Sequence, residues 1–292
     1  MVAPTLLVLL GGPLLLTVVA FAAQARTRGA VDARHEWRWV RVTWGAALAV
    51  GGVAAWLVGT RLDLGRGTML VPAVLGLFVV VGVGLAETVV RPRRPAGVRF
   101  ASLAPRRAVD YLPRALATAV GAITVVHLAT LALTTATASP DDMGRAGRRI
   151  AAQCGDSANG AGPYPGSFYS GPLAVLLVVI GLAAVAAMFA VVRRPRGFAV
   201  DDVGEDVLRR RSVTRVLAAA GAAIAASHAG IAFFAGTALL RMDCQAAWMD
   251  PVGWLLVATV PAALVLLVWF LGRVAVPGGH PTTFPTQPAE LR

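Results

Sequence analysis

The chain has 292 residues, of which 57% are hydrophobic and only 14% are charged, with a formal net charge of +12. Soluble domains contain about 45–50% apolar and about 25% charged residues, so this composition argues against a soluble fold and for a protein of the lipid bilayer. All 27 basic residues are arginines. Without lysine, the chain has neither the lysine of a P-loop ATPase nor the lysine that a retinal Schiff base requires.

Seven apolar segments follow one another, each bounded by Arg, Asp or stretches rich in Pro and Gly. A helix needs about 20 apolar residues to cross the ~30 Å hydrocarbon core of a bilayer, which is the length of these segments. The sequence therefore predicts an all-α, polytopic integral membrane protein of seven transmembrane helices, with residues 1–274 as a single bundle. The expected helices are approximately 3–23, 42–60, 68–87, 115–135, 172–192, 215–240 and 253–274.

The arginines predict the orientation of these helices. The loops 24–41, 88–114 and 193–215, together with the C-terminal end, carry 21 arginines, whereas the loops on the opposite side carry six. Arginine-rich loops stay in the cytoplasm, so we expect the N-terminus outside and the C-terminus in the cytoplasm of a plasma-membrane protein. No positive charge precedes the first segment, which favours a retained helix over a cleaved signal peptide. The Pro- and Thr-rich tail, 275–292, is expected to be disordered.

The same loop arginines explain the basic net charge. Their position beside apolar segments identifies them as topology signals, and we expect contacts with anionic lipid headgroups and no nucleic-acid binding. The longest external loop, 136–171, is rich in Gly, Pro, Ser and Asp and carries Cys154. The only other cysteine, Cys244, lies in a loop expected on the same, oxidising side. The sequence therefore predicts a Cys154–Cys244 disulfide.

An internal repeat relates the fourth and sixth segments. Residues 114–127 align without a gap to residues 215–228, with seven of fourteen positions identical and the same spacing from an arginine to a histidine. The preceding segments match in outline, because Pro72 and Pro172 each precede an apolar run that ends in an Arg/Pro cluster. Helix pairs 3–4 and 5–6 are therefore predicted to form a parallel internal repeat, as in some transporter folds.

The histidines at the ends of the aligned stretch, His127 and His228, are the candidate site. Thirteen residues of helix place each about 20 Å from the cytoplasmic arginines, somewhat past the bilayer centre. Equal depth on two related helices suits two ligands of one buried group, such as a haem b, a transition metal or a quinone. The structural alternative is a pair of neutral histidines hydrogen-bonded to neighbouring helices, and a third reading is a substrate or proton pathway.

The remaining residues favour a protein without catalysis of its own. The sequence shows no nucleotide-binding motif, no protease arrangement, no H-E-x-x-H zinc motif and no C-x-x-C pair, so we predict no catalytic or metal-ligating residues. Glu87 is expected either to extend to the cytoplasmic interface or to pair with an arginine there, and not to relay protons. The first hypothesis is a non-enzymatic, multi-pass plasma-membrane protein, an accessory or permease-like subunit working with other proteins. The alternatives are a haem- or quinone-binding redox protein that uses His127 and His228, and a small-molecule exporter.

Overall fold

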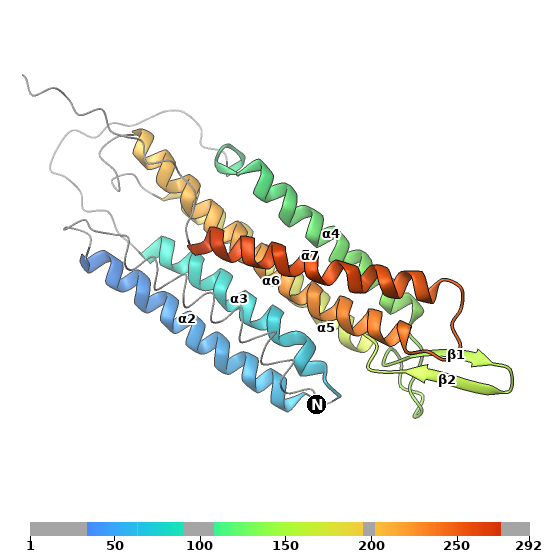
Figure 1. Ribbon diagram of the computed structural model, residues 1–292. Helices are drawn as coiled ribbons and strands as arrows, with labels where there is room; N and C mark the ends of the chain where they lie inside the picture. Colours follow the sequence, from blue (N-terminus) through green and yellow to red (C-terminus); the bar gives the residue numbers. More distant parts are fainter. Residues whose placement is uncertain (1–33, 63, 90–107, 195–201, 276–292) are drawn as a thin grey trace, which may run out of the picture.

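The computed structural model describes residues 34–62, 64–89, 108–194 and 202–275 of the chain. These residues form a bundle of long helices with a small two-stranded hairpin at one end (Figure 1). The helices are α2 (Arg34–Arg61), α3 (Arg66–Val89), η1 (Ala108–Tyr111), α4 (Arg114–Thr137), α5 (Ser167–Arg193), α6 (Asp202–Leu240) and α7 (Met249–Ala275), and the strands are β1 (Ile150–Cys154) and β2 (Ser157–Ala161).

Within the described residues, six helices are long and apolar enough to cross a bilayer, which is consistent with an integral membrane protein. They are α2 to α7, and each overlaps one of the last six expected segments. The first expected segment, 3–23, and nearly all of the expected tail, 275–292, lie outside the described residues. The long helix α6 begins at Asp202, well before its apolar part, and acidic residues in its first turns suit the positive end of the helix dipole.

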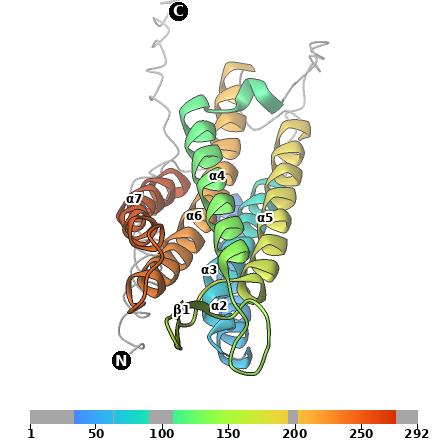
Figure 2. The ribbon, with the colours of Figure 1, turned by 90° about the vertical axis from the view of Figure 1, so that its right-hand side faces the viewer.

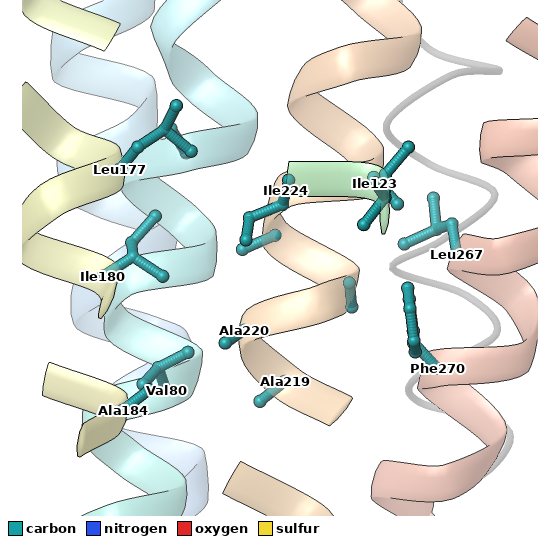
Figure 3. Close-up of a cluster of buried hydrophobic side chains, with 14 of the residues drawn as sticks. Val80, Ile123, Leu177, Ile180, Ala184, Ala219, Ala220, Ile224, Leu267 and Phe270 are labelled. Atoms are coloured by element: carbon teal, nitrogen blue, oxygen red, sulfur yellow. The ribbon is translucent and has the colours of Figure 1, made fainter. Parts of the chain in front are cut away.

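Helix α6 occupies the centre of the bundle and contacts α3, α4, α5 and α7 (Figures 1 and 2). Its small side chains allow these neighbours to approach closely, because alanine and glycine leave the backbone accessible. Figure 3 shows Ala219, Ala220 and Ile224 of α6 between Ile180 of α5 on one side and Phe270 of α7 on the other. The core of the bundle is therefore built around one alanine-rich helix.

The outward faces of the peripheral helices are apolar. Exposed valine, leucine and aromatic side chains project from α2, α4, α5 and α7, and they include Trp56, Val125, Leu182 and Trp254. A soluble monomer rarely exposes so much contiguous apolar surface, whereas a bilayer covers it. Lipid contact around the bundle therefore follows from the pattern of exposure.

At the arginine-rich end, Glu87 of α3 is held by the polar end of α6. Its carboxylate accepts a hydrogen bond from Ser212 Oγ at 2.5 Å and pairs with Arg215 Nη1 at 2.9 Å. Arg194 Nη1 lies 3.7 Å away. Pairing of Glu87 with an arginine agrees with the expectation from sequence, and it joins α3 to α6 at the edge of the membrane-spanning region.

The segment 136–171, expected as a loop without regular structure, contains an antiparallel hairpin. Ile150 pairs with Ala161 at its open end, and Cys154 pairs with Ser157 beside the turn. The turn residues are Gly155 and Asp156, and Gly155 has a φ of 59°, which glycine adopts without strain. The first part of the segment forms successive turns.

Candidate functional site

The structure brings His127 of α4 and His228 of α6 into direct contact. Both side chains are fully buried, with 0% exposure. Their ring centroids lie 5.5 Å apart and the ring planes are nearly perpendicular, at 86°. The two histidines of the proposed repeat therefore meet inside the bundle and do not face lipid.

The hydrogen bonding of the pair is incomplete. His228 Nε2 lies 3.1 Å from Thr259 Oγ1 of α7. Among the described residues, neither nitrogen of His127 nor Nδ1 of His228 has a hydrogen-bond partner. A buried polar atom without a partner costs about 1–3 kcal/mol. The structural alternative, in which neighbouring helices satisfy both rings, therefore fits His228 in part and does not fit His127.

The three helices place the pair and its threonine at one depth. His127 lies ten residues before the end of α4, His228 twelve before the end of α6, and Thr259 ten after the start of α7. At a rise of about 1.5 Å per residue, all three lie about 15–18 Å from the hairpin end of the bundle. Thirteen residues separate each histidine from Arg114 or Arg215 at the other end. The pair consequently sits near the middle of the spanning region.

A row of hydroxyl groups leads from His127 towards the hairpin end. Thr130, Thr134 and Thr137 follow it along one face of α4, and the first two are buried. Thr137 Oγ1 lies 2.7 Å from the hydroxyl of Tyr164, a fully buried side chain. Burial raises the pKa of Tyr164 above its usual range, which keeps the phenol protonated. This row was only partly visible in the sequence, because the partner Tyr164 comes from the distant loop.

On the other side of the pair the interface is apolar and tightly packed. A Cβ added at Gly221 of α6 would lie 2.8 Å from Val120 Cγ2 of α4 and 2.9 Å from Phe270 Cζ of α7. Ile123 and Leu116 of α4 are buried in the same region. Polar access to the histidines is therefore asymmetric, with hydroxyl groups towards the hairpin and packed hydrocarbon towards the arginine-rich end.

The packing around the two histidines can be compared with what a haem, a quinone or an exported small molecule would need. A haem b held by two histidines needs both imidazoles aimed at one iron, with a macrocycle lying between them. The rings here touch each other, and Nε2 of His228 is already engaged by Thr259. The residues present do not fit a haem at this position. The close α4–α6–α7 contact at Gly221 likewise counts against a quinone slot or the central cavity expected of an exporter.

The two cysteines lie on segments that are tied together. Cys154 ends β1, and Cys244 lies in the turn after α6. Asn159 Nδ2 of the hairpin donates a hydrogen bond to Asp243 Oδ2 of that turn, at 2.7 Å. The side chain of Cys154 lies outside what the structure describes, so the disulfide stays a prediction.

Comparison with known proteins gives no family for this chain. No protein-family model matches it, and neither a curated protein nor a solved structure is significantly similar to it. A function must therefore be argued from the site itself.

Proposed function

We propose that the protein is a non-enzymatic, multi-pass protein of the plasma membrane that exchanges a proton at the His127–His228 pair. In this proposal it is permease-like or serves as an accessory subunit beside partner proteins. The observation that carries the proposal is the contact between two fully buried imidazoles, three of whose four nitrogens lack partners among the described residues. Intramembrane ionisable residues mark proton relays and ion pathways by default.

The packing around the pair favours a proton over a larger solute. A proton is bound by an imidazole nitrogen without a cavity, whereas a small molecule needs one. The hydroxyl row from Thr130 to Tyr164 supports access from the hairpin end, since hydroxyl groups both donate and accept hydrogen bonds. The apolar layer at Gly221 and Ile123 supports a barrier towards the arginine-rich end.

The proposal includes the topology expected from the sequence, namely seven helices with the N-terminus outside and the C-terminus in the cytoplasm. It also includes the parallel repeat of helix pairs 3–4 and 5–6. Support for the repeat comes from the equal depth and direct contact of His127 and His228, and from Pro72 and Pro172 in the second turns of α3 and α5.

The experiment is proton flux into liposomes that contain the purified protein and a trapped pH-sensitive dye, driven by a potassium diffusion potential. We expect wild-type flux above that of empty liposomes, loss of this flux in His127→Ala and His228→Ala, and retention in Ser227→Ala. Ser227 is the matched control because it neighbours His228, is buried, and bonds only to the carbonyl of Ala223 in the described structure. Wild-type flux no higher than that of empty liposomes would contradict the proposal.

A transition-metal ion is the second candidate, favoured by the pairing of two imidazoles at one depth. Imidazole nitrogen binds copper, zinc, iron and nickel. The same purified protein distinguishes this case by metal analysis after growth with added metals. One metal ion per chain, lost in both histidine variants, would support a metal site. Metal-free protein that still conducts protons would exclude the metal and support the proton proposal.

A further inference from the structure

The hairpin end of the bundle carries a basic pocket that is separate from the histidine pair. It has a volume of about 500 Å³, which is within the ~300–1,000 Å³ typical of small-molecule sites. Its lining combines four arginines with three apolar side chains: Arg61, Arg66, Arg145, Arg148, Leu62, Leu64 and Phe168. These are four of the six arginines that the sequence assigns to the arginine-poor side, so the few cations of that side converge on one place.

Three separate chain segments build the pocket: the α2–α3 turn, the loop that carries Arg145 and Arg148, and the start of α5 with Phe168. The α2–α3 turn supplies Arg61 and Arg66, and it is tied to the start of α5 by a hydrogen bond from the Tyr169 hydroxyl to the Leu64 carbonyl, at 2.9 Å. Leu64 itself has a φ of 57°, an uncommon conformation for a residue other than glycine. The turn that carries two of the pocket arginines is therefore fixed to the start of α5.

The ring of Phe168 organises two of the guanidinium groups. Arg66 Cζ lies 4.7 Å and Arg148 Cζ 4.1 Å from its centroid, which is the distance of cation–π contacts. Stacking fixes the planes of both groups. It also leaves the Nε atoms of Arg66 and Arg148 buried without a hydrogen-bond partner among the described residues. Pre-oriented guanidinium groups are suited to an oxyanion.

Among the residues that the structure describes, one neighbouring carboxylate compensates part of this charge. Asp141 accepts hydrogen bonds from Arg145 Nε at 2.8 Å and from Arg148 Nη1 at 3.5 Å, and Asp142 pairs with Arg149 outside the pocket. Burial raises the pKa of Asp141, but hydrogen bonds from the Arg145 and Met143 backbones and the Arg145 side chain outweigh it and hold this pKa below its usual range. The described lining thus carries four arginines, two of which are paired with Asp141 beside the pocket.

We propose that this pocket binds a phosphate ester that carries an apolar chain. The excess of guanidinium groups favours a phosphate over a single carboxylate, because a phosphate offers more acceptor oxygens and more charge. Leu62, Leu64 and the Phe168 ring provide apolar contact for the chain next to the charged group. An anionic phospholipid of the bilayer and a soluble amphiphilic phosphate both have this chemistry.

The test uses the full chain, purified in a neutral maltoside detergent, and measures binding by native mass spectrometry. The probes are phosphatidylglycerol, monododecyl phosphate and inorganic phosphate, with zwitterionic phosphatidylcholine as the neutral-lipid reference. The variants are Arg61→Gln and the double variant Arg66→Gln/Arg148→Gln. Arg241→Gln is the matched control, because Arg241 is an exposed arginine at the same end of the bundle and does not line the pocket.

We expect each lost pocket arginine to weaken binding of the chain-bearing phosphates about tenfold, the effect of losing one charged hydrogen bond, and Arg241→Gln to bind like wild type. Arg61 is exposed, so its variant reports on binding even if the double variant folds poorly. Binding of phosphatidylglycerol alone supports a lipid source, and binding of monododecyl phosphate alone supports a soluble one. The proposal is overturned if inorganic phosphate binds as tightly as the esters, or if Arg61→Gln and Arg241→Gln bind alike.

Discussion

At the scale of single residues, most polar side chains of the described bundle have partners, which makes the exceptions informative. Arg209 is nearly fully buried, yet its guanidinium donates to the Val192 carbonyl at 2.5 Å and to the Arg194 carbonyl at 3.0 Å. Glu87 is similarly engaged by Ser212 and Arg215. His127 lacks such partners among the residues described, although it is equally buried. This contrast is the reason for assigning it a role other than packing.

Glu87→Gln should destabilise the protein, because the neutral amide cannot compensate Arg215 of α6 and Arg194 after α5. We expect a loss of about 1–3 kcal/mol, in the range for charged hydrogen bonds that are partly buried. The measurement is thermal unfolding in detergent, followed by tryptophan fluorescence. Asp142→Asn, at an ion pair whose carboxylate is 86% exposed, should leave the midpoint unchanged. An unchanged midpoint for Glu87→Gln as well would show that the cluster contributes nothing to stability.

At the scale of elements, close approach of α6 to its neighbours depends on individual glycines. A Cβ added at Gly76 of α3 would collide with the Cβ of Ala223 on α6, and one added at Gly84 would lie 2.7 Å from the Cβ of Ala187 on α5. In contrast, Gly121 of α4 and Gly181 of α5 have open space at the same position. Glycines at contacts between helices therefore cannot become alanine without a clash, whereas glycines with open space beside them can.

Gly76→Ala should force α3 away from α6 and cost about 1–3 kcal/mol, the usual penalty for adding a methyl group to a packed core. The matched control, Gly181→Ala, should be neutral or stabilising, since alanine favours helix and meets no neighbour there. Melting temperatures of both variants in the same detergent measure the difference. Equal melting temperatures would mean that α3 and α6 are less closely packed than the structure indicates.

The position of the hairpin bears on the predicted disulfide. The Asn159–Asp243 hydrogen bond ties the strand pair to the turn that carries Cys244, which supports the predicted Cys154–Cys244 disulfide. Peptide mapping of unreduced protein should recover the linked peptides, and Cys154→Ser should release one maleimide-reactive thiol. Labelling of both cysteines in the unreduced wild-type protein would rule the bridge out.

At the scale of the whole molecule, much of the architecture could be predicted from the sequence. Six helices lie where apolar segments of spanning length predict them, because segment length and composition are set by the thickness of the bilayer. The equal spacing of His127 and His228 from an arginine predicted that they lie at one depth, but their direct contact was not predicted. Thr259 was missed as a partner of His228, since nothing in α7 indicates which of its faces meets α6.

The hairpin and the basic pocket were missed for related reasons. The pair Gly155-Asp156 is a recognisable two-residue turn, but the strands beside it are short and rich in alanine, so no alternation of apolar residues marks them. The pocket joins residues from the α2–α3 turn to Arg148 and Phe168, more than eighty positions away. Contacts at this separation depend on how the helices pack, which periodicity within one segment does not specify.

The orientation of the whole chain is testable with fusions. An odd number of spans should place an N-terminal epitope outside intact cells and make a C-terminal fluorescent fusion fluoresce in the cytoplasm. Antibody access without permeabilisation measures the first, and cell fluorescence the second. Finding both ends on one side would exclude seven spans and favour an even number.

The central position of α6 has a consequence for how the protein is made. Membrane helices leave the ribosome in chain order, so α4 enters the bilayer before α6 has been synthesised. During that interval His127 lacks the cover of α6 and the neighbouring imidazole of His228 that it has in the finished protein. Burial of this side chain can therefore report completion of synthesis, and a chain cut short before residue 202 would keep an unshielded histidine in the bilayer, a feature that membrane quality control can recognise.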